Sequence, residues 1–203
     1  MTARRMRSPW AREYARTPGS YIWGTAPSAL AVELCRLLPP GARVLDLGCG
    51  EGRDSVFFAA RGHAVTGLDV SRAGLRKAER LARERGVAVR WVHGDVARLP
   101  VQGRFDLVYS CGTIHYLPRR RRALVTRRMR AMTRPAGYHA LVVFTDRLVY
   151  VEMGEEIDYF RPGELRALYA GWRVVRHAER LIACAQDGTP HRHSVEELIA
   201  QSV

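Results

Sequence analysis

One short stretch of the sequence combines glycines with acids in a pattern suited to binding a charged small molecule. It reads Val44-Leu45-Asp46-Leu47-Gly48-Cys49-Gly50-Glu51-Gly52, so an apolar run ends in a glycine-rich turn. Glycines let a backbone turn tightly and approach a ligand closely. A helix that follows the turn offers free N–H groups to an anion. The stretch therefore predicts a strand, a ligand-binding turn and a helix in that order.

Asp46 indicates which of two kinds of cofactor such a turn would bind. A dinucleotide site reads G-x-G-x-x-G and holds a pyrophosphate at the start of the helix. This chain has G-x-G-x-G instead, with Asp46 two residues ahead of the first glycine. A carboxylate there would repel a diphosphate and attract an ammonium group. The pattern favours S-adenosylmethionine, with S-adenosylhomocysteine as product, over NAD.

Polar residues also follow the next three predicted strands. Asp69 ends the second strand, where a carboxylate can accept hydrogen bonds from both ribose hydroxyls. Asp95 follows the third strand and could accept from an adenine amino group. Ser110 and Cys111 end the fourth strand, at the edge where open α/β sheets bind ligands. The predicted cofactor-binding residues are Asp46, Gly48, Cys49, Gly50, Arg53, Asp69, Val70, Asp95, Val96, Ser110 and Cys111.

The acceptor side is predicted from aromatic residues and histidines. His115 follows the fourth strand and could act as a base, because the pKa of histidine lies near neutrality; packing or capping of the next helix explains it equally well. Tyr21 could stack on a ligand or anchor the N-terminal segment. We predict His115, Tyr21 and His193 as catalytic residues, and we predict substrate contacts at Trp23, Tyr14, Tyr116 and His191.

No metal site is predicted. His191 and His193 share one face if their segment is extended, but no third ligand is evident near them in the sequence. The four cysteines are scattered without paired spacing, which argues against a disulfide framework and a zinc site; they are Cys35, Cys49, Cys111 and Cys184.

The stretch VLDLGCGEGRDSVFFAARGHAVTGLDVS resembles the core of class I S-adenosylmethionine-dependent methyltransferases. More narrowly, GCGEGRDS, the leader YIWGTAPS and the tail DGTPHRHSVEELIA resemble the tellurite-resistance and thiopurine methyltransferase-like group. The resemblance implies a leader that closes over the cofactor and an acceptor that faces the end of the fourth strand. It also implies cofactor contacts from Asp46, Gly48, Gly50, Asp69 and Asp95. The tellurite-type enzymes often carry His and Arg shortly before the final turn, and the apolar residues 181–183 found here argue against an oxyanion acceptor.

The elements that must position these residues alternate between strand-like and helix-like patterns. Strands are expected at residues 43–47, 63–68, 87–92, 105–109, 138–144, 172–175 and 193–200, and helices at 28–38, 53–61, 72–85, 119–133 and 162–170. Alternation predicts a Rossmann-like three-layer αβα sandwich with a mostly parallel sheet. The resemblance implies seven strands, the last antiparallel. We expect residues 1–26 to form an arm or lid and residues 27–203 to form the methyltransferase domain.

The composition of the chain limits the classes of partner that it is expected to bind. The net charge is +13, but Lys77 is the only lysine among the 33 basic residues, which indicates compositional bias rather than a nucleic-acid surface. No apolar run approaches a membrane span, so we expect a cytoplasmic, bacterial monomer or homodimer. The predicted function is methyl transfer to S, Se/Te, O or N of a small molecule. An RNA or protein methyltransferase, and a protein that uses the cofactor without methylating, are the alternatives.

Overall fold

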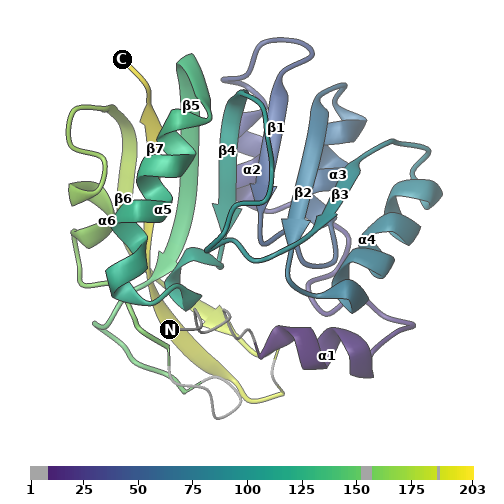
Figure 1. Cartoon of the computed structure of the whole chain (residues 1–203). Coiled ribbons are helices and arrows are strands. Elements are labelled where there is room, and N and C mark those ends of the chain that lie inside the picture. The colour runs from purple at the N-terminus through teal and green to yellow at the C-terminus, as the bar shows by residue number, and fades with distance from the viewer. Residues whose placement is uncertain (1–8, 152–156, 187) are drawn as a thin grey trace.

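A seven-stranded sheet forms the centre of the molecule (Figure 1). The computed structural model describes residues 9–151, 157–186 and 188–203, so the first eight residues of the expected arm and Asp187 of the tail motif lie outside the described residues. The strands are β1 (Arg43–Leu47), β2 (Ala64–Asp69), β3 (Arg90–His93), β4 (Phe105–Cys111), β5 (Thr133–Phe144), β6 (Arg173–Cys184) and β7 (His191–Gln201).

The order of the strands is β3-β2-β1-β4-β5-β7-β6. Strands β1 to β5 are parallel, whereas β7 runs antiparallel to both β5 and β6. This confirms the expected mostly parallel sheet with an antiparallel last strand.

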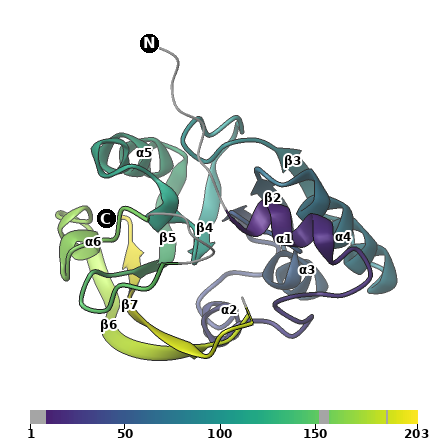
Figure 2. The ribbon, with the colours of Figure 1, turned by 90° about the horizontal axis from the view of Figure 1, so that it is seen from below.

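Helices cover both faces of the sheet, as Figure 2 shows from below. One hydrophobic cluster joins α2 (Ala29–Leu34) and α3 (Arg53–Ala60) to one face, and another joins α5 (Arg119–Ala131) and α6 (Glu164–Ala167) to the other. Helix α4 (Arg72–Glu84) packs against α3, and the short helix η1 (Ile114–Tyr116) follows β4. The first helix, α1 (Trp10–Arg16), lies below the carboxyl ends of the parallel strands in Figure 1.

Local sequence explains how β1 and α4 present the site. Side chains alternate across a strand, so Leu45 packs into one cluster while Val44 packs into the other, and both are fully buried. Asp46 lies on the same side as Val44, near the carboxyl end of β1, where the helical layers leave room for a ligand. At the start of α4 the side chain of Ser71 accepts a hydrogen bond from Gly74 N, so Ser71 caps the helix.

The C-terminal elements differ most from the expectation. Strands β6 and β7 are several residues longer than predicted, because they pair with each other over almost their whole length. Helix α6 is correspondingly shorter than the predicted helix 162–170. Across the described residues, no helix combines the length and apolarity that a membrane span requires.

Candidate active site

The glycine turn between β1 and α3 is held in a conformation that only glycine adopts without strain. Gly48 and Gly50 have φ angles of +74° and +52°. A Cβ on Gly48 would stand 2.0 Å from Thr113 Oγ1, and one on Gly50 would stand 2.7 Å from the Tyr14 hydroxyl oxygen. The turn is therefore enclosed by the segment after β4 on one side and by α1 on the other.

Two buried acids flank this turn. Asp46 accepts a hydrogen bond from Ser55 Oγ at 2.6 Å, and burial raises the pKa of its carboxyl to about 8. Asp69 accepts from the backbone N–H groups of Gly50 (2.9 Å) and Ser71 (2.7 Å). Burial also raises the pKa of Asp69, and these backbone hydrogen bonds oppose the rise. Both side chains line one pocket, which has a volume of about 290 Å³.

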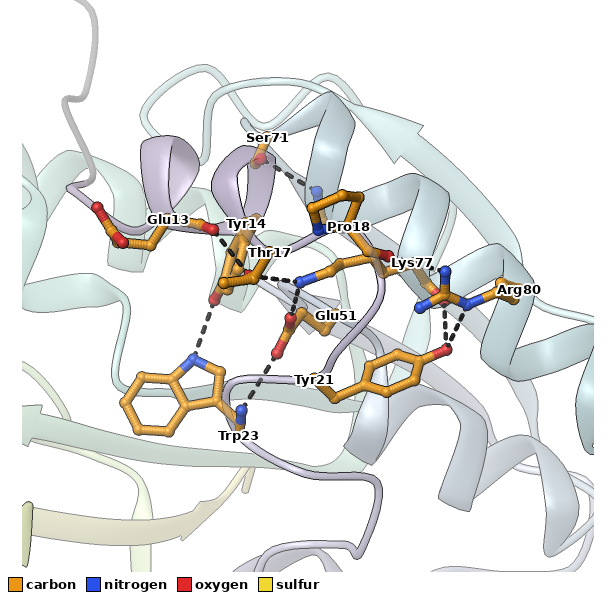
Figure 3. Close-up of polar contacts among 11 residues, drawn as sticks. Glu13, Tyr14, Thr17, Pro18, Tyr21, Trp23, Glu51, Ser71, Lys77 and Arg80 are labelled. Carbon is orange, nitrogen blue, oxygen red and sulfur yellow. Dashed lines mark hydrogen bonds and ion pairs between the residues drawn. The ribbon is translucent and has the colours of Figure 1, made fainter. Parts of the chain in front are cut away.

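The N-terminal arm closes one side of the pocket, and Figure 3 shows the polar contacts of its Tyr14 and Trp23. Trp23 Nε1 donates to the Tyr14 hydroxyl at 3.1 Å, and Trp23 N donates to Glu51 Oε2 at 3.2 Å. Trp10 packs on Trp23 with ring centroids 4.7 Å apart, and its Nε1 donates to the Tyr116 hydroxyl. Tyr14 and Trp23, two of the predicted substrate contacts, thus meet beside the glycine turn, together with Trp10.

A buried ion pair between α4 and the glycine turn also forms hydrogen bonds with the N-terminal arm. The Lys77 ammonium of α4 contacts Glu51 and donates to Thr17 Oγ1 at 3.1 Å, as Figure 3 shows. The Lys77 and Glu51 side chains are only 3% and 2% exposed. Tyr21 lies further along the arm, where its hydroxyl donates to the Lys77 carbonyl and accepts from Arg80 Nε. The only lysine of the chain therefore has a defined place in the structure, which charge counting did not indicate.

The opposite wall of the pocket comes from the C-terminal half of the sheet. It is mainly apolar and includes Val142, Phe144 and Ile182, with Cys184, Gln186 and His193 beside them. Of these residues the predicted site contained only His193, although the apolar stretch 181–183 was expected to bear on the acceptor. The others were not predicted, because the pairing of β5, β7 and β6 brings together residues distant in sequence. Sequence analysis also missed the polar group behind the glycine turn, in which Asp54 accepts from Tyr109 and from Ser28 N.

Most of the predicted site residues line this pocket. They are Asp46, Gly48, Cys49, Gly50, Arg53, Asp69, Val70, Cys111, Tyr14, Trp23, Tyr116 and His193. Six others are not among the lining residues: Asp95, Val96, Ser110, His115, Tyr21 and His191.

Local contacts explain the positions of several of these six. Asp95 accepts from Ala97 N at 2.7 Å, which places its carboxylate in a turn after β3. Ser110 donates to the Leu47 carbonyl, and Val96 is fully buried in the core. His115 is fully buried and stacks on Phe144, and its Nδ1 accepts from Phe144 N. Burial holds the pKa of His115 well below its usual value, so the ring is neutral.

The arginines of α5 largely contact the protein itself. Arg122 is 1% exposed, pairs with Glu164 at 2.9 Å and lies over the Phe160 ring. Arg119 pairs with Asp158, and Arg121 and Arg130 donate to backbone carbonyls. These contacts hold α5 against α6 and neighbouring loops, so these arginines stabilise the fold.

The sequence is similar to those of known methyltransferases. Residues 44–137 match the model of a family described as a methyltransferase domain. Trans-aconitate 2-methyltransferase of Deinococcus radiodurans is 38% identical over 122 residues, 58% of this chain and 45% of the relative. The probable S-adenosyl-L-methionine-dependent methyltransferase TehB of Haemophilus influenzae is 24% identical over 153 residues, 74% of this chain and 52% of the relative. The chain thus spans about half the length of these curated relatives.

The crystal structure of TehB from Haemophilus influenzae has the same fold. It superposes with a TM-score of 0.79 at 21% sequence identity, over 88% of this chain and 63% of that one.

Proposed function

Because this chain belongs to the class I S-adenosylmethionine-dependent methyltransferases, in the group similar to TehB, we propose that it methylates a heteroatom of a small-molecule acceptor. The charge of the pocket is the main support for S-adenosylmethionine as the cofactor. Four buried acids, Asp46, Glu51, Asp54 and Asp69, line the cavity, whereas its basic lining residues, among those described, are Arg53 and His193. That balance suits a ligand with positive charge and disfavours a diphosphate.

The residues of the pocket fit S-adenosylmethionine. We assign Asp46 to its ammonium group and Asp69 to its ribose hydroxyls, with the glycine turn beneath it and Arg53 near its carboxylate. Tyr14, Trp10 and Trp23 cover the site and exclude water. The bound cofactor would supply a methyl group on a sulfonium, which makes it both the electrophile and the leaving group. The protein has to hold the acceptor in line and keep the site dry.

The shape of the site supports a small acceptor. The arm lies across the pocket, and the opposite wall is apolar with a few polar groups at one end, as in small-molecule sites. His115 lies behind Phe144 rather than in the pocket lining. A soft nucleophile such as a thiolate needs no base, so we favour a thiol or another chalcogen over a hydroxyl. Several arginines of α5 contact the protein itself, which argues against the use of this helix as a binding surface for RNA.

Cofactor binding is the first test of this proposal. In calorimetry the wild type should bind S-adenosylmethionine with micromolar affinity and should not bind NAD. Asp69→Asn should weaken binding by about 10–100-fold, because a hydrogen bond to a charged acceptor contributes about 1.5–3 kcal/mol. Asp106→Asn is the matched control, since Asp106 pairs with Arg134 near the start of β4. Binding of NAD alone would refute the assignment, and tight cofactor binding without turnover on thiol, selenite and hydroxyl acceptors would refute methyl transfer to a small molecule.

Cofactor affinity should rise with pH because of Asp46. Its carboxyl has a pKa of about 8 in the free protein, so it is protonated at lower pH, whereas an ammonium ligand favours the ionised form. Affinity should therefore fall by up to about tenfold for each pH unit below 8. Calorimetry between about pH 5.5 and 7.5, where the ammonium keeps its proton, would measure this slope. Asp46→Asn should bind weakly and with a flatter profile; an unchanged slope would show that another group titrates.

A further inference from the structure

We propose that Cys184, His191 and His193 form a three-ligand site for a single Zn²⁺-like cation at the acceptor end of the pocket. Their ligand atoms, one from each residue, all lie within 4.8 Å of one another. Cys184 and His193 line the pocket. The sequence spacing suggested only the histidine pair, and pairing of β6 with β7 supplies the third donor.

The register of the two strands puts all three side chains on one face. Cys184 of β6 stands directly opposite His191 of β7, and Ile182 stands opposite His193. Residues opposite each other in an antiparallel pair share a face, as do residues two apart along a strand. Arg192 lies between the two histidines in sequence and therefore projects to the other face. The positive charge nearest in sequence is thus directed away from the three donors.

The hydrogen bonds of His191 prepare it as a ligand. Its Nδ1 donates to the Thr189 carbonyl at 2.6 Å, because a carbonyl oxygen can only accept. A backbone carbonyl on one ring nitrogen is the usual partner of a metal-binding histidine, since it leaves the other nitrogen with its lone pair. That other nitrogen, Nε2, lies 2.8 Å from His193 Nε2. Tyr150 stacks on the His191 ring with centroids 3.5 Å apart and fixes its plane.

The donor atoms lie within 4.8 Å of one another, so they need to move by up to about an ångström to reach the separations of ligands on one Zn²⁺. Two nitrogens bound to one tetrahedral Zn²⁺ stand about 3.3 Å apart, and a nitrogen and a thiolate sulfur about 3.6 Å apart. The histidine nitrogens would need to separate by about half an ångström. His193 stacks on Phe144 at 4.0 Å, and the Cys184 thiol lies 2.9 Å from Gln186 Oε1. We expect these side chains to reach the ion by rotation, without a change of the backbone register.

The donor set indicates the class of cation. One thiolate and two imidazoles suit Zn²⁺ and softer ions, whereas Mg²⁺ and Ca²⁺ prefer oxygen ligands. Three protein ligands leave a fourth position of a tetrahedron for water or another molecule, which is the arrangement of a catalytic rather than a structural zinc site. Because two of the three ligands line the pocket, that position would be accessible from it. A thiol acceptor entering the pocket could bind there as its thiolate.

Titration of the full-length protein with Co²⁺ tests the site without reference to methyl transfer. We expect one Co²⁺ per chain, the charge-transfer absorption of a cobalt–thiolate bond, and displacement by one equivalent of Zn²⁺ but not by Mg²⁺. Cys184→Ser should abolish the thiolate absorption. His193→Gln should lower the affinity by more than about a hundredfold, since loss of only an outer hydrogen-bond partner already costs about 10–100-fold. Cys35→Ser, at the end of α2, is the control and should behave as wild type.

Three outcomes would overturn the proposal. They are thiolate absorption that persists in Cys184→Ser or disappears in Cys35→Ser, a wild-type protein that binds no Co²⁺ or Zn²⁺, and variants with native circular dichroism whose affinity equals that of the wild type. Because none of these measurements uses S-adenosylmethionine, failure of the metal site would leave the proposed methyl transfer untouched, and the reverse also holds.

Discussion

Replacing Lys77 with methionine should lower the free energy of unfolding by about 3–5 kcal/mol, the usual cost of removing one partner of a buried ion pair. Lys77 and Glu51 are both almost fully buried. Methionine fills similar space but leaves the Glu51 carboxylate without its counter-charge and Thr17 without its donor. The arm should detach from α4, which urea unfolding and the fluorescence of Trp10 and Trp23 would report. Cofactor affinity should fall with it.

Two controls separate the ion pair from general damage. Arg83→Met removes an exposed pair with Glu79, whose side chains are 71% and 58% exposed, and should change stability by less than about 0.5 kcal/mol. The double variant Lys77→Met/Glu51→Gln leaves no unpaired charge at these two positions, so much of the lost stability should return. If Lys77→Met unfolds at the same urea concentration as Arg83→Met, the pair does not hold the arm.

Gly48→Ala should reduce affinity for S-adenosylmethionine by more than about a hundredfold, or about 2.7 kcal/mol. Any non-glycine residue with positive φ at this position costs about 1–2 kcal/mol. The new methyl group would also stand 2.0 Å from Thr113 Oγ1, so either the turn or the segment after β4 must move. Both line the pocket. Calorimetry on the purified variant would measure the loss directly.

Gly86→Ala isolates the effect of backbone strain. Gly86 follows α4 with a φ of +63°, and a Cβ there would meet open space. In this variant the strain should lower the free energy of unfolding by a similar amount, but the affinity for the cofactor should equal that of the wild type. Equal affinity in Gly48→Ala and Gly86→Ala would mean that close approach at Gly48 is not needed for binding.

The cofactor half of the fold was predictable because its signals are local. The bounds of β1 were predicted without error, and the N-cap and apolar stripe of α4 follow from single side chains at helical spacing. The C-terminal half was less predictable. Strands β6 and β7 are long because they pair with each other. Neither segment, taken alone, contains a sequence pattern that predicts this pairing. The same pairing brings Cys184 to His191.

The candidate site divides in the same way. The acids and glycines at the ends of β1 and β2 follow directly from their motif. His115 fits the sequence pattern of an acceptor-side base, but it stacks behind Phe144, since burial of the segment after β4 depends on β5 and β7. Lys77 gave no sequence signal because its partner Glu51 lies 26 residues away and belongs to the glycine turn.

The two walls of the pocket have different origins along the chain, and this bears on how such proteins diverge. The acids and glycines that we assign to the methyl donor all lie within residues 44–137, the part that matches the family model. Trp10 and Trp23 on one side of the pocket, and the β6–β7 hairpin on the opposite wall, lie outside it. We therefore expect that the sequences of the two terminal segments can change while the donor site that we assign is kept. Chimaeras that exchange only these terminal segments between relatives should carry acceptor preference with them.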